Sequence, residues 1–534
     1  MLRSIFLFFS IFFLTFVAVA QTTNFTANFT LTDQPDTERF ITILLGTGQV
    51  GTLGTALVQL NMNQQLADNE QSGVGQAGAG LTLFFNRTDT IGISLAGIPD
   101  PTQPTITQTG RINSGGGAYV LISNPAPSGP TVNVTLTRIS GSPLRYNLSM
   151  TGNATLGGQT ISLAITNMVV ALANTRVNVF QTSTGSGTVT PGGPAQVSAT
   201  ITPGGAVTFD KAQFAEISAT ISFNQADSAR VFFTLVGETP PPNIPFTITG
   251  GTGVYQGAYG SGTLNLVGQD GVTMTGTITL AGPTTPVITS VQTASSPFLR
   301  VATNDWIYIK GKNLVPANTP AGGMYWSNAP EFAQGKMPTQ VGTISVTVNG
   351  KPAYVWWFCS AATTPACTQD QINVLTPLED VKDQQVMIVV KNGSDSSAPF
   401  LVFKQEEAPS VLMFDTMGHA VATHLNGSLL GPTSLYPGLS TPGKGGETVT
   451  LWAVGFGLPA TPLVEGSSSQ SGSLPSSPVC FLGGTQVQVT AALVGPGLYI
   501  LNITIPNTAA AGDNFFYCTH NNTPPAPVLV TVGP

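Results

Sequence analysis

The sequence predicts an all-β protein with two tandem β-meander or barrel repeats followed by two β-sandwiches. Three observations lead to this prediction. A chain of 534 residues is too long for one hydrophobic core. It contains 60 glycines, 40 prolines and 41% apolar residues, which is typical of many short strands joined by tight turns. Each half of the chain also repeats its own strand pattern, which indicates tandem domains.

The charge of the chain narrows the range of partners. Charged residues make up 8% of the chain, the formal net charge is −7 and the isoelectric point is about 4.9. A nucleic-acid partner would require a basic stripe, because binding depends on neutralising phosphates. The sequence contains no cluster of lysine and arginine. We therefore expect no nucleic-acid partner and a surface covered by hydroxyl and amide side chains.

Residues 1–20 have the pattern of a secretory signal peptide. Arg3 provides a positive start, residues 5–16 are apolar, and Ala18-Val19-Ala20 is a small-residue cleavage site before Gln21. An uncleaved membrane anchor is the alternative, because the apolar run continues to the end of this segment. No later stretch is long and apolar enough for a membrane helix. We expect cleavage, no membrane span in the mature chain, and a secreted or cell-surface protein.

The N-terminal half contains two copies of one pattern, predicted as repeats over 21–165 and 166–285. Gly46-Thr47-Gly48 is echoed 139 positions later by Gly185-Ser186-Gly187, and later matches follow in the same order with slowly shrinking offsets. The alternation of threonine with apolar residues over 272–280 is the period-2 pattern of a half-buried strand. Such a meander must close into a barrel or pack as a sandwich, and the pattern leaves both open.

Glycine-rich stretches in the first repeat also match a dinucleotide-binding fingerprint. The pattern G-x-G-x-x-G occurs at residues 46–51 and again at 73–78. A nucleotide site needs this loop to open a helix within a βαβ unit, and no amphipathic helix follows either match. We therefore interpret these glycines as turn residues and expect no nucleotide and no cofactor.

Two aspartates occupy equivalent places in the repeats, Asp89 after Phe85-Asn86 and Asp227 after Phe223-Asn224. They could serve a glycosidase-like reaction, or they could form structural Asx turns. The segment 248–262 resembles the glycine-rich stretch of allene oxide cyclase and dirigent-like barrels, which implies a small antiparallel barrel. Convergent glycine-rich turns are the alternative. The N-terminal half has no histidine or cysteine, which excludes Ser-His-Asp and Cys-His catalysis there.

The C-terminal half reads as two rounds of one strand pattern, predicted as domains over 286–405 and 406–534. Its ordered motifs are Gly311-Lys-Asn-Leu314, Val348-Asn-Gly350, Gln371-Ile-Asn373, the block 446–457 and the block 495–506. On these motifs it resembles the uncharacterised C-terminal domain of Solibacter-type secreted bacterial proteins, itself similar to tandem IPT/TIG modules. The resemblance implies a pair of immunoglobulin-like sandwiches, with no catalytic residues to carry over. The insertion at 359–367 departs from that pattern.

The four cysteines lie in the C-terminal half, and an even number in an exported chain favours disulfides. Proximity predicts Cys359–Cys367 and Cys480–Cys518, with free thiols as the alternative. Their spacing is not that of a zinc site. His419 and His424 are predicted to lie in a solvated connection between the sandwiches, so we expect no metal.

Aromatic residues give the strongest indication of a binding site. Tyr354, Trp356 and Phe358 are predicted to share one face of a strand, with Trp357 opposite and Tyr325 and Trp326 in a nearby loop. Exposed aromatic rings favour contacts with sugars or proteins, whereas buried ones belong to the core. The candidate ligand-binding residues are Tyr325, Trp326, Tyr354, Trp356 and Trp357.

Taken together, these features favour a secreted or cell-surface binding or adhesion protein without catalytic residues. Its expected ligand is an extracellular carbohydrate or protein. Two alternatives remain: a barrel-type enzyme, cyclase-like or active on glycosides, and a structural spacer or display protein. The enzyme alternative predicts a deep pocket lined by polar groups. The spacer alternative predicts no exposed aromatic patch.

Overall fold

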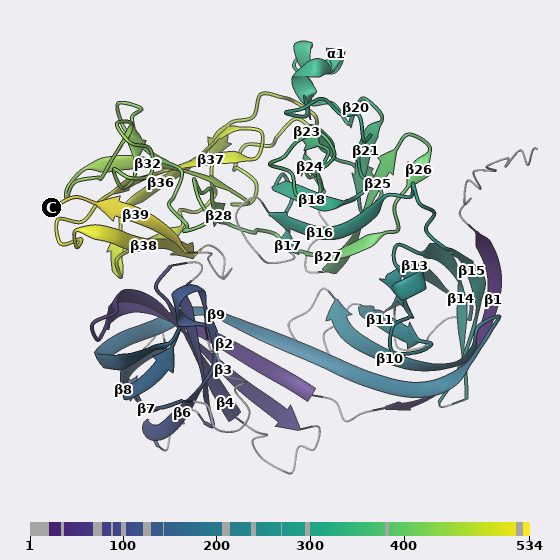
Figure 1. The fold of residues 1–534 in the computed structure, drawn as a ribbon, viewed down its shortest axis with the longest axis horizontal. Helices are drawn as coiled ribbons and strands as arrows, with labels where there is room; N and C mark the ends of the chain where they lie inside the picture. Colours follow the sequence, from purple (N-terminus) through teal and green to yellow (C-terminus); the bar gives the residue numbers. More distant parts are fainter. Residues whose placement is uncertain are drawn as a thin grey trace, which may run out of the picture.

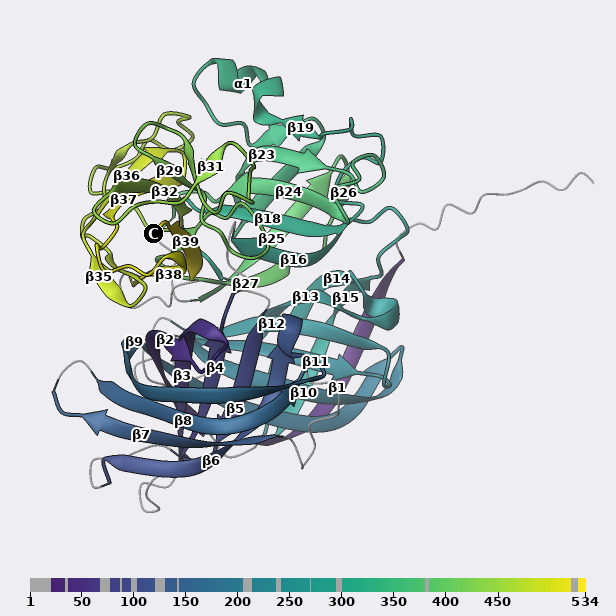
Figure 2. The same ribbon diagram turned by 60° about the vertical axis from the view of Figure 1, so that its left-hand side comes forward.

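The computed structural model describes residues 21–33, 37–67, 77–86, 89–97, 103–120, 130–141, 144–204, 214–236, 242–268, 270–293, 300–379, 384–519 and 527–534. The predicted signal peptide lies outside these residues. The described chain is almost entirely β-structured, which confirms the predicted fold class. The N-terminal half forms two closed barrels, and the C-terminal half forms two sandwiches on one side of them (Figures 1 and 2).

The first barrel closes through eight strands in the order β2 to β9. In the part that the structure describes, its core is built from apolar residues such as Leu60, Leu83 and Ile91, which are fully buried. The strands are β2 (Thr37–Val50), β3 (Gly54–Ala67), β4 (Ala77–Phe84), β5 (Thr90–Leu95), β6 (Thr105–Gly116), β7 (Thr131–Ile139), β8 (Arg145–Leu156) and the first part of β9 (Gln159–Thr190).

The second barrel also closes through eight strands, from the last part of β9 to β15 and then β1. Phe25, Ala27 and Phe29 of β1 enter its apolar core. The strands that follow β9 are β10 (Gly193–Gly204), β11 (Phe214–Ser222), β12 (Ser228–Val236), β13 (Ile244–Thr252), β14 (Tyr259–Val267), β15 (Gly271–Thr279) and β1 (Thr22–Asp33).

The two repeats exchange their first strands. By the repeat offset of 139, β1 is equivalent to the first part of β9, yet β1 closes the second barrel and that part of β9 closes the first. The exchange is symmetric: the pair Thr32↔Thr184 in one barrel corresponds, through the same offset, to Leu45↔Ala171 in the other. Figure 1 shows β9 running from one barrel into the other and β1 beside β14 and β15. The predicted repeat boundary at 165/166 therefore falls inside a strand shared by both barrels.

This exchange explains the repeated Gly-x-Gly motif. A Cβ at Gly185 would lie 2.2 Å from the carbonyl oxygen of Thr30, and one at Gly46 would lie 2.4 Å from that of Val169. Thr30 and Val169 are themselves equivalent in the two repeats. Glycine is therefore required where the exchanged strand passes closest, because any side chain would collide with its backbone. The motif serves strand packing, and no helix follows it.

The first sandwich packs a five-stranded sheet, in the order β16-β18-β24-β23-β19, against a second sheet in the order β17-β27-β25-β21-β20. Its core contains Ile307, Ile309 and Phe358. The hairpin predicted at Asn349-Gly350 is present, with both residues at positive φ. The strands are β16 (Val287–Thr293), β17 (Arg300–Val301), β18 (Trp306–Lys312), β19 (Met324–Tyr325), β20 (Gln340–Val341), β21 (Ile344–Val348), β22 (Lys351–Pro352), β23 (Tyr354–Cys359), β24 (Asp370–Leu375), β25 (Gln384–Asn392), β26 (Asp395–Ser396) and β27 (Phe400–Lys404).

The second sandwich repeats this plan with one sheet in the order β31-β30-β29-β32-β37-β36-β33 and another in the order β35-β34-β38-β39. Both predicted disulfides are present: Cys359–Cys367 in the first sandwich and Cys480–Cys518 across β34 and β38 of the second. The strands are β28 (Ser410–Val411), β29 (Ala422–His424), β30 (Leu429–Leu430), β31 (Ser440–Thr441), β32 (Thr448–Val454), β33 (Gly472–Ser473), β34 (Val479–Leu482), β35 (Thr485–Val487), β36 (Val489–Gly495), β37 (Leu498–Thr504), β38 (Gly512–Thr519) and β39 (Val528–Val532).

Apolar and polar contacts join the four domains. Ile43 and Leu57, on the outside of the first barrel, pack against Phe515 and Tyr517 of the second sandwich, and burial raises the pKa of Tyr517 to about 12. The sandwiches meet through a buried hydrogen bond of 2.9 Å from Asn304 to Gln470. The barrel pair begins and ends at one place, because Thr22 pairs with Thr279 and the Leu280 N–H donates to the Gln21 carbonyl.

Candidate ligand-binding face

A β-bulge in β23 turns two consecutive tryptophans toward the same side of the five-stranded sheet. The pairing of β23 with β24 shifts register between Val355 and Trp357. Val355 and Phe358 both lie in the core, whereas Trp356 is 37% exposed. The predicted alternation, with Trp356 and Phe358 on one face and Trp357 opposite, is therefore wrong, because the bulge inserts one extra residue.

Strand register places a row of aromatic and amide side chains across this sheet. Tyr308 on β18 lies opposite Asn373 on β24, Asn373 lies opposite Trp357 on β23, and Trp357 lies opposite Tyr325 on β19. Directly opposite residues on neighbouring strands point to the same side of the sheet. We call Trp306, Tyr308, Tyr325, Trp356 and Trp357 the aromatic face.

The rings of the aromatic face contact one another. The centroid of Tyr325 lies 6.4 Å from that of Trp356 and 6.2 Å from that of Trp357, and Trp306 lies 5.4 Å from Trp356. The indole N–H of Trp306 donates to the Pro496 carbonyl at 2.7 Å, and that of Trp357 donates to the Gly322 carbonyl at 3.0 Å. These bonds hold two of the rings in place, so the face is organised before any ligand arrives.

The structure separates the five residues predicted from the sequence into two groups. Tyr325, Trp356 and Trp357 belong to the aromatic face. Trp326 instead stacks on Phe332 at 5.0 Å, in the short segment formed by η4 (Trp326–Asn328) and α1 (Pro330–Ala333). Tyr354 is buried at the junction of the sandwiches, and burial is the main cause of its raised pKa. Trp326 therefore packs within the first sandwich, where it also lies 5.7 Å from Trp306, and Tyr354 packs the two sandwiches together.

Two members of the face, Trp306 and Tyr308, were not among the residues predicted from the sequence. Both lie on β18, where buried Ile307 and Ile309 alternate with more exposed neighbours. This period-2 signal was present in the sequence and indicates that Trp306 and Tyr308 point away from the core.

The paired aspartates of the barrels are structural. Asp89 accepts hydrogen bonds from the Asn86 side chain at 2.6 Å and from the Ala118 N–H at 2.8 Å. Asp227 repeats this arrangement with Asn224 at 2.8 Å and the Val254 N–H at 3.0 Å, and these bonds lower its pKa. In each barrel the carboxylate therefore ties a hairpin to the short 3-10 turn η1 (Gly117–Tyr119) or η3 (Gly253–Tyr255).

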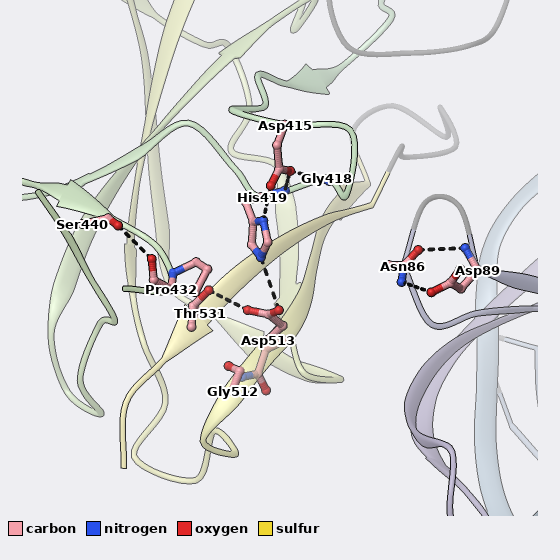
Figure 3. A network of polar contacts seen from close by, with 11 residues as sticks. Asn86, Asp89, Asp415, Gly418, His419, Pro432, Ser440, Gly512, Asp513 and Thr531 are labelled. Atoms are coloured by element: carbon pink, nitrogen blue, oxygen red, sulfur yellow. Dashed lines mark hydrogen bonds and ion pairs between the residues drawn. The ribbon is translucent and has the colours of Figure 1, made fainter. Parts of the chain in front are cut away.

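The prediction that His419 and His424 are solvated is wrong. His419 is buried, with Nδ1 2.6 Å from Asp415 and Nε2 3.3 Å from Asp513 (Figure 3). The hydrogen bond that His419 donates to the Asp513 carboxylate is the main cause of the rise in the pKa of His419 to about 9. His424 Nδ1 lies 2.6 Å from Glu447. Each histidine thus contacts a carboxylate: Asp415 lies in the turn before His419, Asp513 lies on β38, and Glu447 directly precedes β32.

Two further carboxyls are buried at junctions between domains. Glu216 of the second barrel accepts the Gln385 N–H of the first sandwich at 2.7 Å, beside a cavity of about 260 Å³, and burial raises its pKa to about 7. Asp305, between the sandwiches, receives the Ala302 N–H at 3.3 Å, and burial raises its pKa to about 8. Both shifts arise mainly from loss of solvent, so they reflect domain packing.

Within the described ranges, no group of three or more histidine, cysteine, aspartate or glutamate side chains is placed to hold a metal ion. In the same part of the chain no helix is long and apolar enough to cross a bilayer. No family model matches the sequence, and no curated protein matches it. Among solved structures, Escherichia coli alpha-2-macroglobulin activated by porcine elastase aligns with 10% identity and a TM-score of 0.12, over 96% of this chain and 52% of that chain. A similarity this weak carries no argument about function.

Proposed function

We propose that the protein is an exported, non-catalytic binding protein that holds an extracellular carbohydrate on the aromatic face. The observation that carries this proposal is the row Tyr308, Asn373, Trp357 and Tyr325 across one sheet. Aromatic rings present apolar surfaces that suit the C–H faces of sugar rings, while amides can pair with sugar hydroxyls. Tyr325 is 44% exposed and Trp356 is 37% exposed, so a ligand can reach them.

The chemistry of the other polar clusters supports a binding role over catalysis. Asp89 and Asp227 are occupied by asparagine and backbone N–H groups. His419 is occupied by two carboxylates. Both barrels have apolar cores, whereas the enzyme alternative requires a polar pocket inside a barrel. The two disulfides fit an extracellular location.

The experiment is a binding screen of the full chain against a panel of polysaccharides, followed by ring deletions. Trp356→Ala and Tyr325→Ala should each weaken binding about tenfold, because a central aromatic contact contributes on the order of 1–2 kcal/mol. Tyr436→Ala is the matched control, because Tyr436 is also 37% exposed but lies in the second sandwich, where it makes an edge-to-face contact with Phe414.

The two ring deletions should leave the thermal transition of the protein unchanged. A loss of binding can then be attributed to the missing ring rather than to unfolding. Retention of no polysaccharide would contradict the proposal, as would unchanged binding by both ring variants. If the protein retained only a protein ligand, and Trp356→Ala abolished that binding, the aromatic face would be a protein-binding site. That result would also overturn the carbohydrate proposal.

A further inference from the structure

The outer side of β18 continues from aromatic to basic residues. Its burial alternates along the strand, so Trp306, Tyr308, Lys310 and Lys312 share the outward side while Ile307 and Ile309 fill the core. Side chains on one side of a strand recur roughly every 7 Å. The two lysines therefore extend the aromatic face by two further steps along the same line.

Lys310 is held next to the aromatic row. Its ammonium nitrogen lies 5.3 Å from the centroid of the Tyr308 ring, which is cation–π distance. Across the strand pairs, Lys310 lies opposite Gln371 on one side and Ser290 on the other. The neighbours of this lysine in the sheet are thus neutral hydrogen-bonding side chains.

The sheet offers these lysines no carboxylate on the outward side. The acidic residue in the sequences of β16, β18, β19, β23 and β24 is Asp370, and it is buried. Its side chain accepts the Leu314 N–H at 3.1 Å and the Ala361 N–H at 3.0 Å. No ion pair of Lys310 or Lys312 is found among the residues that the structure describes.

Two unopposed lysines beside exposed rings are unusual in a chain with 8% charged residues and a net charge of −7. The net charge would repel an anionic polymer at long range, but at physiological salt this field is screened within about 8 Å. At contact distance, the electrostatic potential that acts on a ligand is set mainly by these two lysines and is positive.

We infer that the carbohydrate held by the aromatic face is an acidic polysaccharide, whose carboxylate or sulfate groups pair with Lys310 and Lys312 while its sugar rings lie on the aromatic residues. This inference rests on the proposed function and adds the charge of the ligand to it. The ammonium group of lysine is a compact point charge that can pair with either a carboxylate or a sulfate, so both carboxylated and sulfated polymers fit this chemistry.

The test uses the full chain and two pairs of polymers that differ only in charge: polygalacturonate against its methyl ester, and dextran sulfate against dextran. At least one acidic polymer should bind at least tenfold more tightly than its neutral partner, and this preference should decrease as salt rises. Lys310→Gln combined with Lys312→Gln should remove the preference and leave binding of the neutral partner unchanged. Lys351→Gln combined with Lys391→Gln, in the opposite sheet, is the matched control and should change neither.

Each other outcome overturns a defined part of the proposal. Equal binding of charged and neutral partners, with loss on Trp356→Ala, overturns the inference about charge and leaves the proposed function standing. A preference for an acidic polymer that persists after the double lysine substitution also overturns the inference, because residues other than Lys310 and Lys312 would then bind the acidic groups. Binding of none of the four polymers, nor of any other polysaccharide in the panel, overturns both.

Discussion

The barrel pair and the sandwich pair are both duplications, but they are joined in different ways. The barrels share backbone, because each is closed by the first strand of the other repeat. Each sandwich is closed by its own strands and has its own disulfide; the two meet through contacts such as Asn304 with Gln470 and a short backbone bridge between Lys336 and Ser467. Two domains closed by exchanged strands must fold as one body, whereas domains that each keep their own strands can have separate stabilities and diverge separately.

The outward faces of the sandwiches show this divergence. In the first, β18 presents Trp306 and Tyr308 beside Asn373. In the second, Thr448 of β32 hydrogen-bonds Thr504 at 3.2 Å, and Thr450 donates to Asn502 at 2.7 Å. The polar groups of the second face thus pair with one another, which is why we place the binding role on the first.

The largest expected effect tests the independence of the sandwiches. Replacing Cys480 and Cys518 by alanine opens a link between residues 38 positions apart and should lower the stability of the second sandwich by about 4 kcal/mol. Hydrogen exchange should then accelerate in β32 and β37 but not in the barrels. Replacing Cys359 and Cys367, only 8 positions apart, should cost the first sandwich about 2.5 kcal/mol. Equal acceleration in the barrels would show that the domains do not unfold separately.

The next effect tests the unity of the barrels. Gly185→Ala places a Cβ 2.2 Å from the Thr30 carbonyl and should lower the free energy of unfolding by about 3 kcal/mol. Since the strands are shared, calorimetry should show both barrels melting together at the lower temperature. In the control Gly80→Ala, the nearest atom to the new Cβ is 3.9 Å away, so the transition should move little. Separate melting of the second barrel alone would argue against a single cooperative unit.

The smallest effect concerns pH and the second sandwich alone. The pKa of His419 rises from 6.5 to about 9 on folding, so its protonated form stabilises the folded state. This contribution, about 1–2 kcal/mol after solvent screening, is complete below pH 6.5 and is lost as pH rises through 9. Thermal melts between pH 6 and 10 should show this decline.

Asp513→Asn should flatten the same pH profile, because Asp513 is the main cause of the His419 shift. A wild-type profile that stays level through pH 9 would contradict the ion-pair assignment.

Much of this fold follows from local sequence patterns. Period-2 alternation, as at Thr273 and Met274, predicts strands, and Asn349-Gly350 predicts a hairpin that is present. The order of matching motifs revealed the repeats. Proximity and cysteine parity predicted both disulfides correctly.

The strand exchange could not be predicted in this way. The first strands of the two repeats are equivalent in pattern, so each fits either barrel, and nothing local distinguishes its own barrel from the neighbouring one. The interpretation of Gly46 and Gly185 as turn residues was wrong: both lie within strands, at the places where the exchanged strand passes closest. The bulge at Val355 could not be predicted for a related reason. The sequence Val355-Trp356-Trp357-Phe358 is compatible both with strict alternation and with a bulge. The burial of Phe358 in the core shows that the bulge is the structure adopted.

The neighbouring ends of the barrel pair bear on how far the protein can extend. Thr22 pairs with Thr279, so the chain leaves the barrels where it enters them. Any group that held residue 21 would therefore lie beside the start of the sandwiches, and the two barrels would add almost nothing to the distance between that group and the sandwiches. A spacer would place its two ends far apart, whereas the two ends of this barrel pair lie side by side.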